Sequence, residues 1–151
     1  MIRAESAKQN FLSGYNCAQA VALAFSDVLN QEEKAIARLT SSFGGGMGRM
    51  REVCGTVSGA LFVLGAAIGY DDPEDLEGKK ALYRTVQDFA RRFKEETGSV
   101  ICRELLEGVP TQAGSAPEPR TETYYKKRPC ADLVLLSAQI TETILTEKGV
   151  L

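Results

Sequence analysis

Apolar residues recur along most of the chain at the three- and four-residue spacing of amphipathic helices, and no run alternates as a half-buried strand does. This pattern predicts an all-α fold: a single-domain helical bundle of about six to seven helices over residues 1–151. A first helix is expected over about 3–12. The second is expected to begin after Asn16, a suitable N-cap because Gln19 stands three residues later in capping-box register.

A third helix is predicted over about 31–42, following the N-cap candidate Asn30 and directing Ile36 and Leu39 inward. The glycine-rich segment 44–48 is expected to end it.

The apolar stretch 57–68 predicts a central, buried helix, because it is too short to span a bilayer. Gly55 and Gly59 are one helical turn apart, and so are Gly65 and Gly69. We expect the backbone of another helix to approach closely at these small residues, which would also suit a homodimer.

A long amphipathic helix is predicted next, capped by Asp72, opened by Pro73 and closed by Gly98. Its inward residues are expected to be Leu82, Val86, Phe89 and Phe93. Ser99 is the expected cap of a short helix that ends near Glu107.

Before the last helix lies a segment, 108–128, that contains three prolines and is far longer than the usual helix connection. Three roles are open for it: a flexible lid, an arm for a partner, or a disordered loop. Pro129 is then expected to open the last helix. Its predicted inward residues are Leu133, Leu136, Ile140 and Ile144.

The charge balance limits the classes of partner. With 18 basic and 20 acidic residues and a net charge of -2, the chain is not built to neutralise phosphate, so we expect no nucleic-acid partner. A redox partner protein or a small molecule is the expected partner. No secretory signal or membrane-spanning run is visible, which favours a cytoplasmic protein that is not membrane-embedded.

The candidate chemistry lies in four cysteines, each of which stands where a helix is expected to begin: Cys17, Cys54, Cys102 and Cys130. Unpaired N–H groups and the helix dipole favour thiolate, which is the form that reacts and binds metal. In a reducing compartment such cysteines are more plausibly metal ligands or working thiols than structural disulfides. The chain has no histidine, which excludes Ser-His-Asp and Cys-His chemistry.

The sequence Cys54-Gly55-Thr56-Val57-Ser58-Gly59, together with the glycine-rich segment 44–50 before it, resembles the C_GCAxxG_C_C family of small bacterial and archaeal redox proteins. The similarity extends over nearly the whole chain, from 14–20 to the helix after Cys130. Cys54, Gly55 and Gly59 match the motif directly, and Cys17, Cys102 and Cys130 fill the other signature positions. Thr56 replaces the family's alanine and adds a methyl and a hydroxyl group beside Cys54.

The resemblance implies a redox role without a named substrate. Some haem-bearing relatives are similar over this cysteine region and hold an iron–sulfur centre. This chain has no C-x-x-C-H sequence, so the haem does not carry over.

Two mechanisms are open, and the first is a four-thiolate metal site used for electron transfer or sensing. Its ligands would be Cys17, Cys54, Cys102 and Cys130. An iron–sulfur cluster is favoured over a zinc ion as the bound cofactor, because the resemblance is to redox proteins. Supporting backbone N–H groups would come from the glycines, namely Gly45, Gly46, Gly48, Gly55 and Gly59. A nucleotide site at these glycines is disfavoured, because no strand precedes them.

The second mechanism is thiol–disulfide exchange, in which Cys54 would cycle with one of the other three cysteines. Arg49, Arg51 or Arg103 would help to lower the pKa of a thiol. A further alternative is a non-catalytic helical scaffold whose cysteines only fill the core. The basic run 126–128 is expected to be a solvated loop end, with a lesser role in placing an anionic partner near Cys130.

Overall fold

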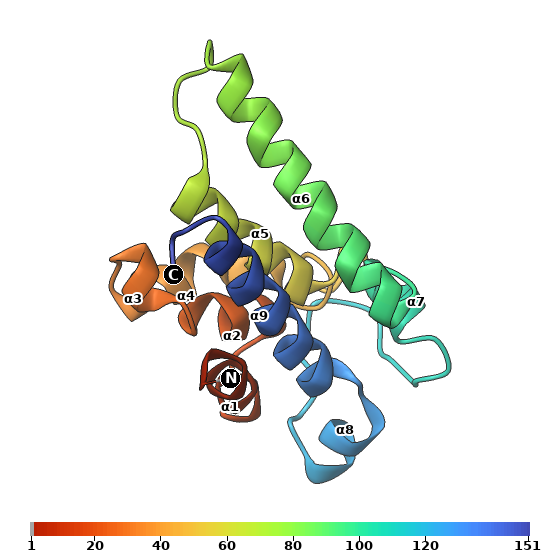
Figure 1. The fold of residues 1–151 in the computed structure, drawn as a ribbon. Coiled ribbons are helices and arrows are strands. Elements are labelled where there is room, and N and C mark those ends of the chain that lie inside the picture. The colour runs from red at the N-terminus through yellow and green to blue at the C-terminus, as the bar shows by residue number, and fades with distance from the viewer. Residues whose placement is uncertain (1) are drawn as a thin grey trace.

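The computed structural model describes residues 2–151, and every regular element among them is helical (Figure 1). This confirms the predicted all-α fold. Residues 2–151 form nine α-helices and one 3-10 helix, more than expected, because three of the α-helices have only four to six residues. They are α1 Ile2–Leu12, α2 Cys17–Leu23, α3 Ser26–Leu29, α4 Glu33–Leu39, η1 Ser41–Phe43, α5 Gly55–Ile68, α6 Leu76–Thr97, α7 Cys102–Leu105, α8 Glu122–Lys127 and α9 Cys130–Glu147.

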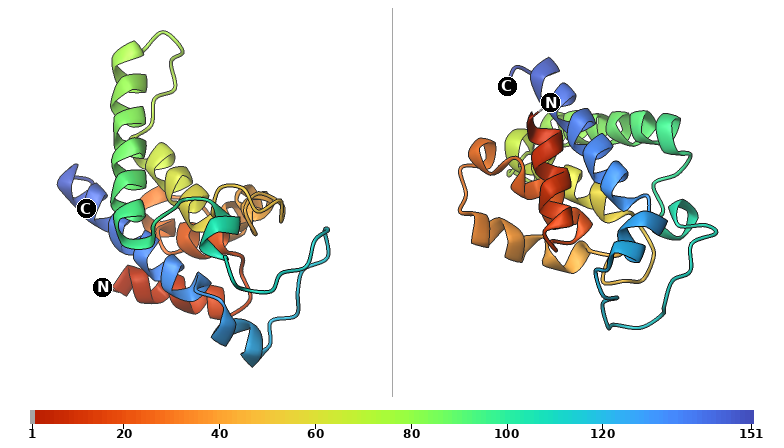
Figure 2. Two further views of the ribbon diagram at one scale, coloured as in Figure 1. Left: turned by 90° about the vertical axis from the view of Figure 1, so that its right-hand side faces the viewer. Right: turned by 90° about the horizontal axis from the view of Figure 1, so that it is seen from below.

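The two ends of the chain pack against each other, because α1 lies along α9 (Figures 1 and 2). The alanine-rich α2 lies against α1, α5 and α9, and its short side chains let these helices come close. The core is completed by large side chains that are fully buried, among them Phe11, Phe25, Phe89 and Phe93.

Gly55 and Gly59 allow the closest approach, between α5 and α2. A Cβ atom on Gly59 would lie 2.6 Å from the carbonyl oxygen of Ala18, and one on Gly55 would lie 3.0 Å from Cβ of Cys17. The predicted close packing is therefore confirmed for this pair of glycines. The prediction of close packing is wrong for the second pair of glycines. A Cβ atom on Gly65 would have nothing within 4 Å, and one on Gly69 would meet only the backbone of Gly65, in α5 itself.

Two helices begin later than predicted. Asn30 does not cap α4 but ends α3 in the left-handed conformation, with φ of 51°. At α6 the cap is Asp75, whose side chain accepts a hydrogen bond from the N–H of Gly78, whereas Asp72 accepts from Glu74 inside the loop. In both places several residues compatible with capping lie close together, and tertiary packing selects one of them.

The predicted inward faces are confirmed in part. Ile36 is buried, but Leu39 at the end of α4 is 57% exposed. In α6, Phe89 and Phe93 are buried, whereas Leu82 and Val86 are half-buried, because the first turns of this helix extend beyond the other helices (Figure 1). In α9, Leu133, Ile140 and Ile144 are buried and Leu136 is half-buried.

The segment 108–128 is not entirely loop, because it contains α8. The short helix after Gly98 is also later than predicted: it begins at Cys102, while the side chain of Ser99 accepts a hydrogen bond from the N–H of Ile101. Within residues 2–151, no helix has the length and apolar character needed to cross a membrane.

We expect Gly59→Ala to destabilise the fold, because its Cβ would collide with a backbone carbonyl that cannot move alone. Such overpacking costs about 1–3 kcal/mol in the free energy of unfolding, measured by urea denaturation. Gly65→Ala is the matched control in the same helix and should be neutral or stabilising by up to about 1 kcal/mol. Equal losses for both variants would contradict the close contact.

Candidate functional site

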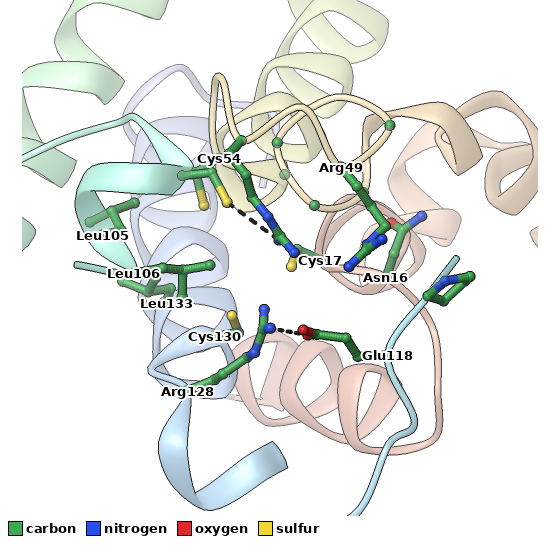
Figure 3. Close-up of a pocket in the computed structure, with 18 of the residues that line it drawn as sticks. Asn16, Cys17, Arg49, Cys54, Leu105, Leu106, Glu118, Arg128, Cys130 and Leu133 are labelled. Atoms are coloured by element: carbon green, nitrogen blue, oxygen red, sulfur yellow. Dashed lines mark hydrogen bonds and ion pairs between the residues drawn. The ribbon is translucent and has the colours of Figure 1, made fainter. Parts of the chain in front are cut away.

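The four cysteines occupy four separate helix starts, as the sequence predicts. Cys17, Cys102 and Cys130 are the first residues of α2, α7 and α9, and Cys54 is the N-cap of α5. All four line one cavity of about 410 Å³ (Figure 3). All four are free thiols.

The position of Cys17 is fixed by the capping box before it. The side chain of Asn16 accepts a hydrogen bond from the N–H of Gln19 at 2.9 Å, and the side chain of Gln19 accepts from the N–H of Asn16 at 3.0 Å. Asn16 also donates to the carbonyl of Ser41 at 3.0 Å, which ties this helix start to the segment that enters the glycine loop.

Cys54 and Cys102 are brought together by the only strand-like pairing among residues 2–151, the bridge between Val53 and Ile101. The N–H of Cys54 donates to the carbonyl of Val100 at 2.8 Å, and the N–H of Cys102 donates to the carbonyl of Glu52 at 2.6 Å. These bonds satisfy N–H groups at two helix starts and place both thiols at the same end of the cavity.

The glycine loop winds in the left-handed sense next to the cysteines. Its residues with φ between 60° and 73° are Gly45, Gly46, Met47, Gly48, Arg49 and Arg51. Three of these are not glycines, and left-handed backbone costs such residues about 1–2 kcal/mol each. Strain of this kind is concentrated at functional sites.

Glycine is required at position 46, because a Cβ atom there would lie 2.7 Å from Cβ of Cys102. The N–H groups of Gly45, Gly46 and Gly48 donate to no acceptor within the described part of the chain. Of the glycines predicted to support the site, these three and Gly55 line the cavity, whereas Gly59 only packs against α2.

Among the groups around Cys130, the thiol of Cys17 has the largest effect on its acidity. It lowers the pKa of Cys130 to about 7 against the opposing effect of burial, and the charges of Arg128, Arg120 and Arg51 lower it further. The interaction with Cys130, together with burial, raises the pKa of Cys17 well above its usual value. Of these two thiols, Cys130 is therefore the more acidic.

The other two thiols do not follow the expected effect of a helix start, because burial outweighs it. Burial raises the pKa of Cys54 to about 11, although Thr56 opposes the shift through its hydroxyl, 3.1 Å from the sulfur, and its N–H. The predicted hydroxyl beside Cys54 is thus in contact with the sulfur. Burial also raises the pKa of Cys102, against the guanidinium of Arg51, which lies 4.0 Å from that sulfur.

Sequence reasoning missed one arginine of the cavity, Arg120, and for the run 126–128 it favoured a solvated loop end over a role near Cys130. Arg128 is not a solvated loop end: it is buried, paired with Glu118, and lies 4.5 Å from the ring centroid of Tyr124. Its place two residues before Cys130 is a signal that could have indicated this role. The predicted helper Arg103 does not line the cavity, because it pairs with Glu52 at 3.1 Å.

The segment 108–121 forms one wall of the cavity through Ser115, Pro117, Glu118 and Arg120. Arg49 holds it by donating to the carbonyls of Gly114 and Gln112, at 2.5 and 3.0 Å. Of the three roles expected for this segment, its position over the cavity favours the lid.

The family model for "Putative redox-active protein (C_GCAxxG_C_C)" matches residues 15–144, a range that includes all four cysteines. The chain belongs to this family. A search of curated proteins and a search of solved structures each found no match.

In this C_GCAxxG_C_C protein, the four thiols are soft donors of the kind that bind zinc or iron–sulfur centres. Within residues 2–151, no three Cys, Asp or Glu side chains are gathered tightly enough to hold one metal ion. A tetrahedral zinc site needs sulfurs about 4 Å apart, since each Zn–S bond is about 2.3 Å. An iron–sulfur cluster holds its thiolates further apart, because several iron and sulfide atoms lie between them.

We expect iodoacetamide to alkylate Cys130 first in the reduced, metal-free protein, because the thiolate is the nucleophile. The rate should rise with pH through about 7, whereas Cys54, with a pKa of about 11, should stay unreactive there. Peptide mass spectrometry over a pH series measures both rates. Cys17→Ala removes the neighbouring thiol and should move the Cys130 profile to higher pH; an unchanged profile would contradict the effect of Cys17 on Cys130.

Proposed function

We propose that this protein holds an iron–sulfur cluster on Cys17, Cys54, Cys102 and Cys130 and uses it for electron transfer or sensing. The observation that carries the proposal is the convergence of four thiols, from four separate helix starts, on one cavity of about 410 Å³. Four soft thiolate donors without histidine suit iron–sulfur chemistry. The cluster, when bound, would supply the one-electron chemistry.

Groups of the chain itself would stabilise the negative charge of such a site. The unpaired N–H groups of Gly45, Gly46 and Gly48 are available as donors to sulfur, and Arg51 adds a positive charge beside Cys102. Donors and charges of this kind set the reduction potential of cysteine-ligated centres.

Burial would separate the site from water. The exposed fractions of Cys54, Cys102 and Cys130 are only 5%, 7% and 8%. Leu105, Leu106 and Leu133 add an apolar wall on their side of the cavity (Figure 3). The other side is polar, which would let a redox partner protein or a small molecule exchange electrons there.

Thiol–disulfide exchange is the second candidate, and it is favoured by Cys17 and Cys130, two free thiols of the same cavity that strongly affect each other's pKa. The Cys130 thiolate would attack a substrate disulfide and release one thiol; Cys17 would then attack the mixed disulfide and release the second. The substrate disulfide is reduced to two thiols while the pair is oxidised to one disulfide. In this scheme Cys130, rather than Cys54, is the attacking residue.

We expect protein purified without oxygen to be brown and to contain iron and acid-labile sulfide. Each of the four Cys→Ser variants should lose most of the iron, because four ligands hold one centre. Circular dichroism checks that each variant folds, and Ser13→Ala, an exposed change at the end of α1, is the control that should keep its iron. Colourless, iron-free wild-type protein with a Cys17–Cys130 disulfide after mild oxidation would reject the cluster in favour of exchange.

Thr56→Ala restores the residue of the family motif and tests the contact with Cys54 without removing a ligand. Loss of the hydroxyl donor 3.1 Å from the sulfur should leave the iron content unchanged and make the reduction potential more negative, since hydrogen bonds to sulfur stabilise the reduced state. Potentiometric titration measures the shift. Thr143→Ala, on the exposed part of α9, should leave the potential unchanged. The same potential for wild type and Thr56→Ala would contradict a tuning role for Thr56.

A further inference from the structure

The cavity is positively charged, although the chain as a whole carries a net charge of -2. The arginines that line the cavity are Arg49, Arg51, Arg120 and Arg128. The only carboxylate in its wall is that of Glu118. A concave wall with charge of one sign concentrates the electric field and attracts ions of the other sign.

Most of this positive charge is not neutralised. Glu118 is occupied by its ion pair with Arg128, in which both side chains are largely buried. Within residues 2–151, Arg49, Arg51 and Arg120 have no carboxylate within 4.0 Å.

Two of the three unneutralised guanidinium groups are held in place by neutral oxygens. Arg49 donates to the carbonyls of the lid segment, and Arg120 donates to the carbonyls of Phe11 and Tyr15 at 3.0 and 3.1 Å. Such bonds fix the side chains without cancelling their charge. The arginines are therefore positioned before any ligand arrives, which lowers the entropy cost of binding.

The cysteines do not account for all of the positive charge. Arg128, Arg120 and Arg51 lower the pKa of Cys130, whereas Arg49 is not among the charges that act most strongly on any of the four thiols. Arg49 lies beside Asn16, across the cavity from the end with Cys54 (Figure 3). On this side of the cavity the fixed positive charge of Arg49 has Asn16 and Cys17 as neighbours (Figure 3).

We propose that the cavity binds a small oxyanion at Arg49 and Arg51, beside the cysteines, and that the redox substrate belongs to this class: a small molecule with a carboxylate, phosphate or sulfur-oxyanion group. Guanidinium groups pair with such oxygens through two parallel N–H donors. That the bound anion is the redox substrate rests on the proposed redox function. That the cavity binds an anion at all does not.

The test is isothermal titration calorimetry of the full-length protein with sodium sulfate at low ionic strength. Wild type should bind one sulfate saturably. Arg49→Gln and Arg51→Gln should each weaken binding about tenfold or more, because a charge-assisted hydrogen bond is lost. Arg84→Gln, at an exposed position on α6, removes the same net charge far from the cavity and should leave the affinity unchanged.

Equal weakening in all three variants, or no saturable binding by wild type, would overturn the proposal. Arg51→Gln keeps the test independent of the lid, because the Arg51 guanidinium donates to the sulfur of Cys102 and, within residues 2–151, forms no hydrogen bond with the segment 108–121. The titration is repeated with iron-loaded and metal-free protein. Sulfate binding by the metal-free form supports the anion site whatever the iron content of the purified protein, and binding by neither form overturns it. Iron and sulfide analysis of the purified protein tests the cluster separately.

Discussion

Where Gly59 meets the carbonyl of Ala18, α2 and α5 lie so close that no side chain fits between them. This contact positions the two helix starts that carry Cys17 and Cys54, since even a Cβ atom on Gly55, the residue after Cys54, would lie only 3.0 Å from Cβ of Cys17. A second backbone contact, the bridge at Val53, brings in α7 and Cys102. The positions of these three cysteines therefore depend on backbone packing, whereas the glycine loop and the segment 108–121 line other parts of the cavity.

The cavity combines two properties with opposite effects on its thiols. Cys54, Cys102 and Cys130 are buried, which disfavours their charged form, and the walls of the cavity carry arginines that favour it. At Cys130 the contact with Cys17 and the arginines outweigh burial, whereas at Cys54 burial outweighs the contact with Thr56. One site thus contains thiols of very different acidity, and a bound anionic centre or substrate would add negative charge that the arginines can balance.

The parts that could be predicted from the sequence are those set by local interactions. The capping box at Asn16 places Cys17 correctly because both of its hydrogen bonds are formed within four residues. The later start of α6 at Asp75 could not be predicted, because Asp72 is equally suited to capping by local criteria. The role of Arg120 also has no local signal: it depends on stacking over Phe11, at the other end of the chain.

The most direct test of the central claim is a crystal structure of anaerobically purified protein with anomalous diffraction recorded at the iron edge. The account predicts an iron signal inside the cavity, bonded to the sulfurs of Cys17, Cys54, Cys102 and Cys130. Iron bound at any other place, or an iron-free cavity in which Cys17 and Cys130 are joined by a disulfide, would contradict it.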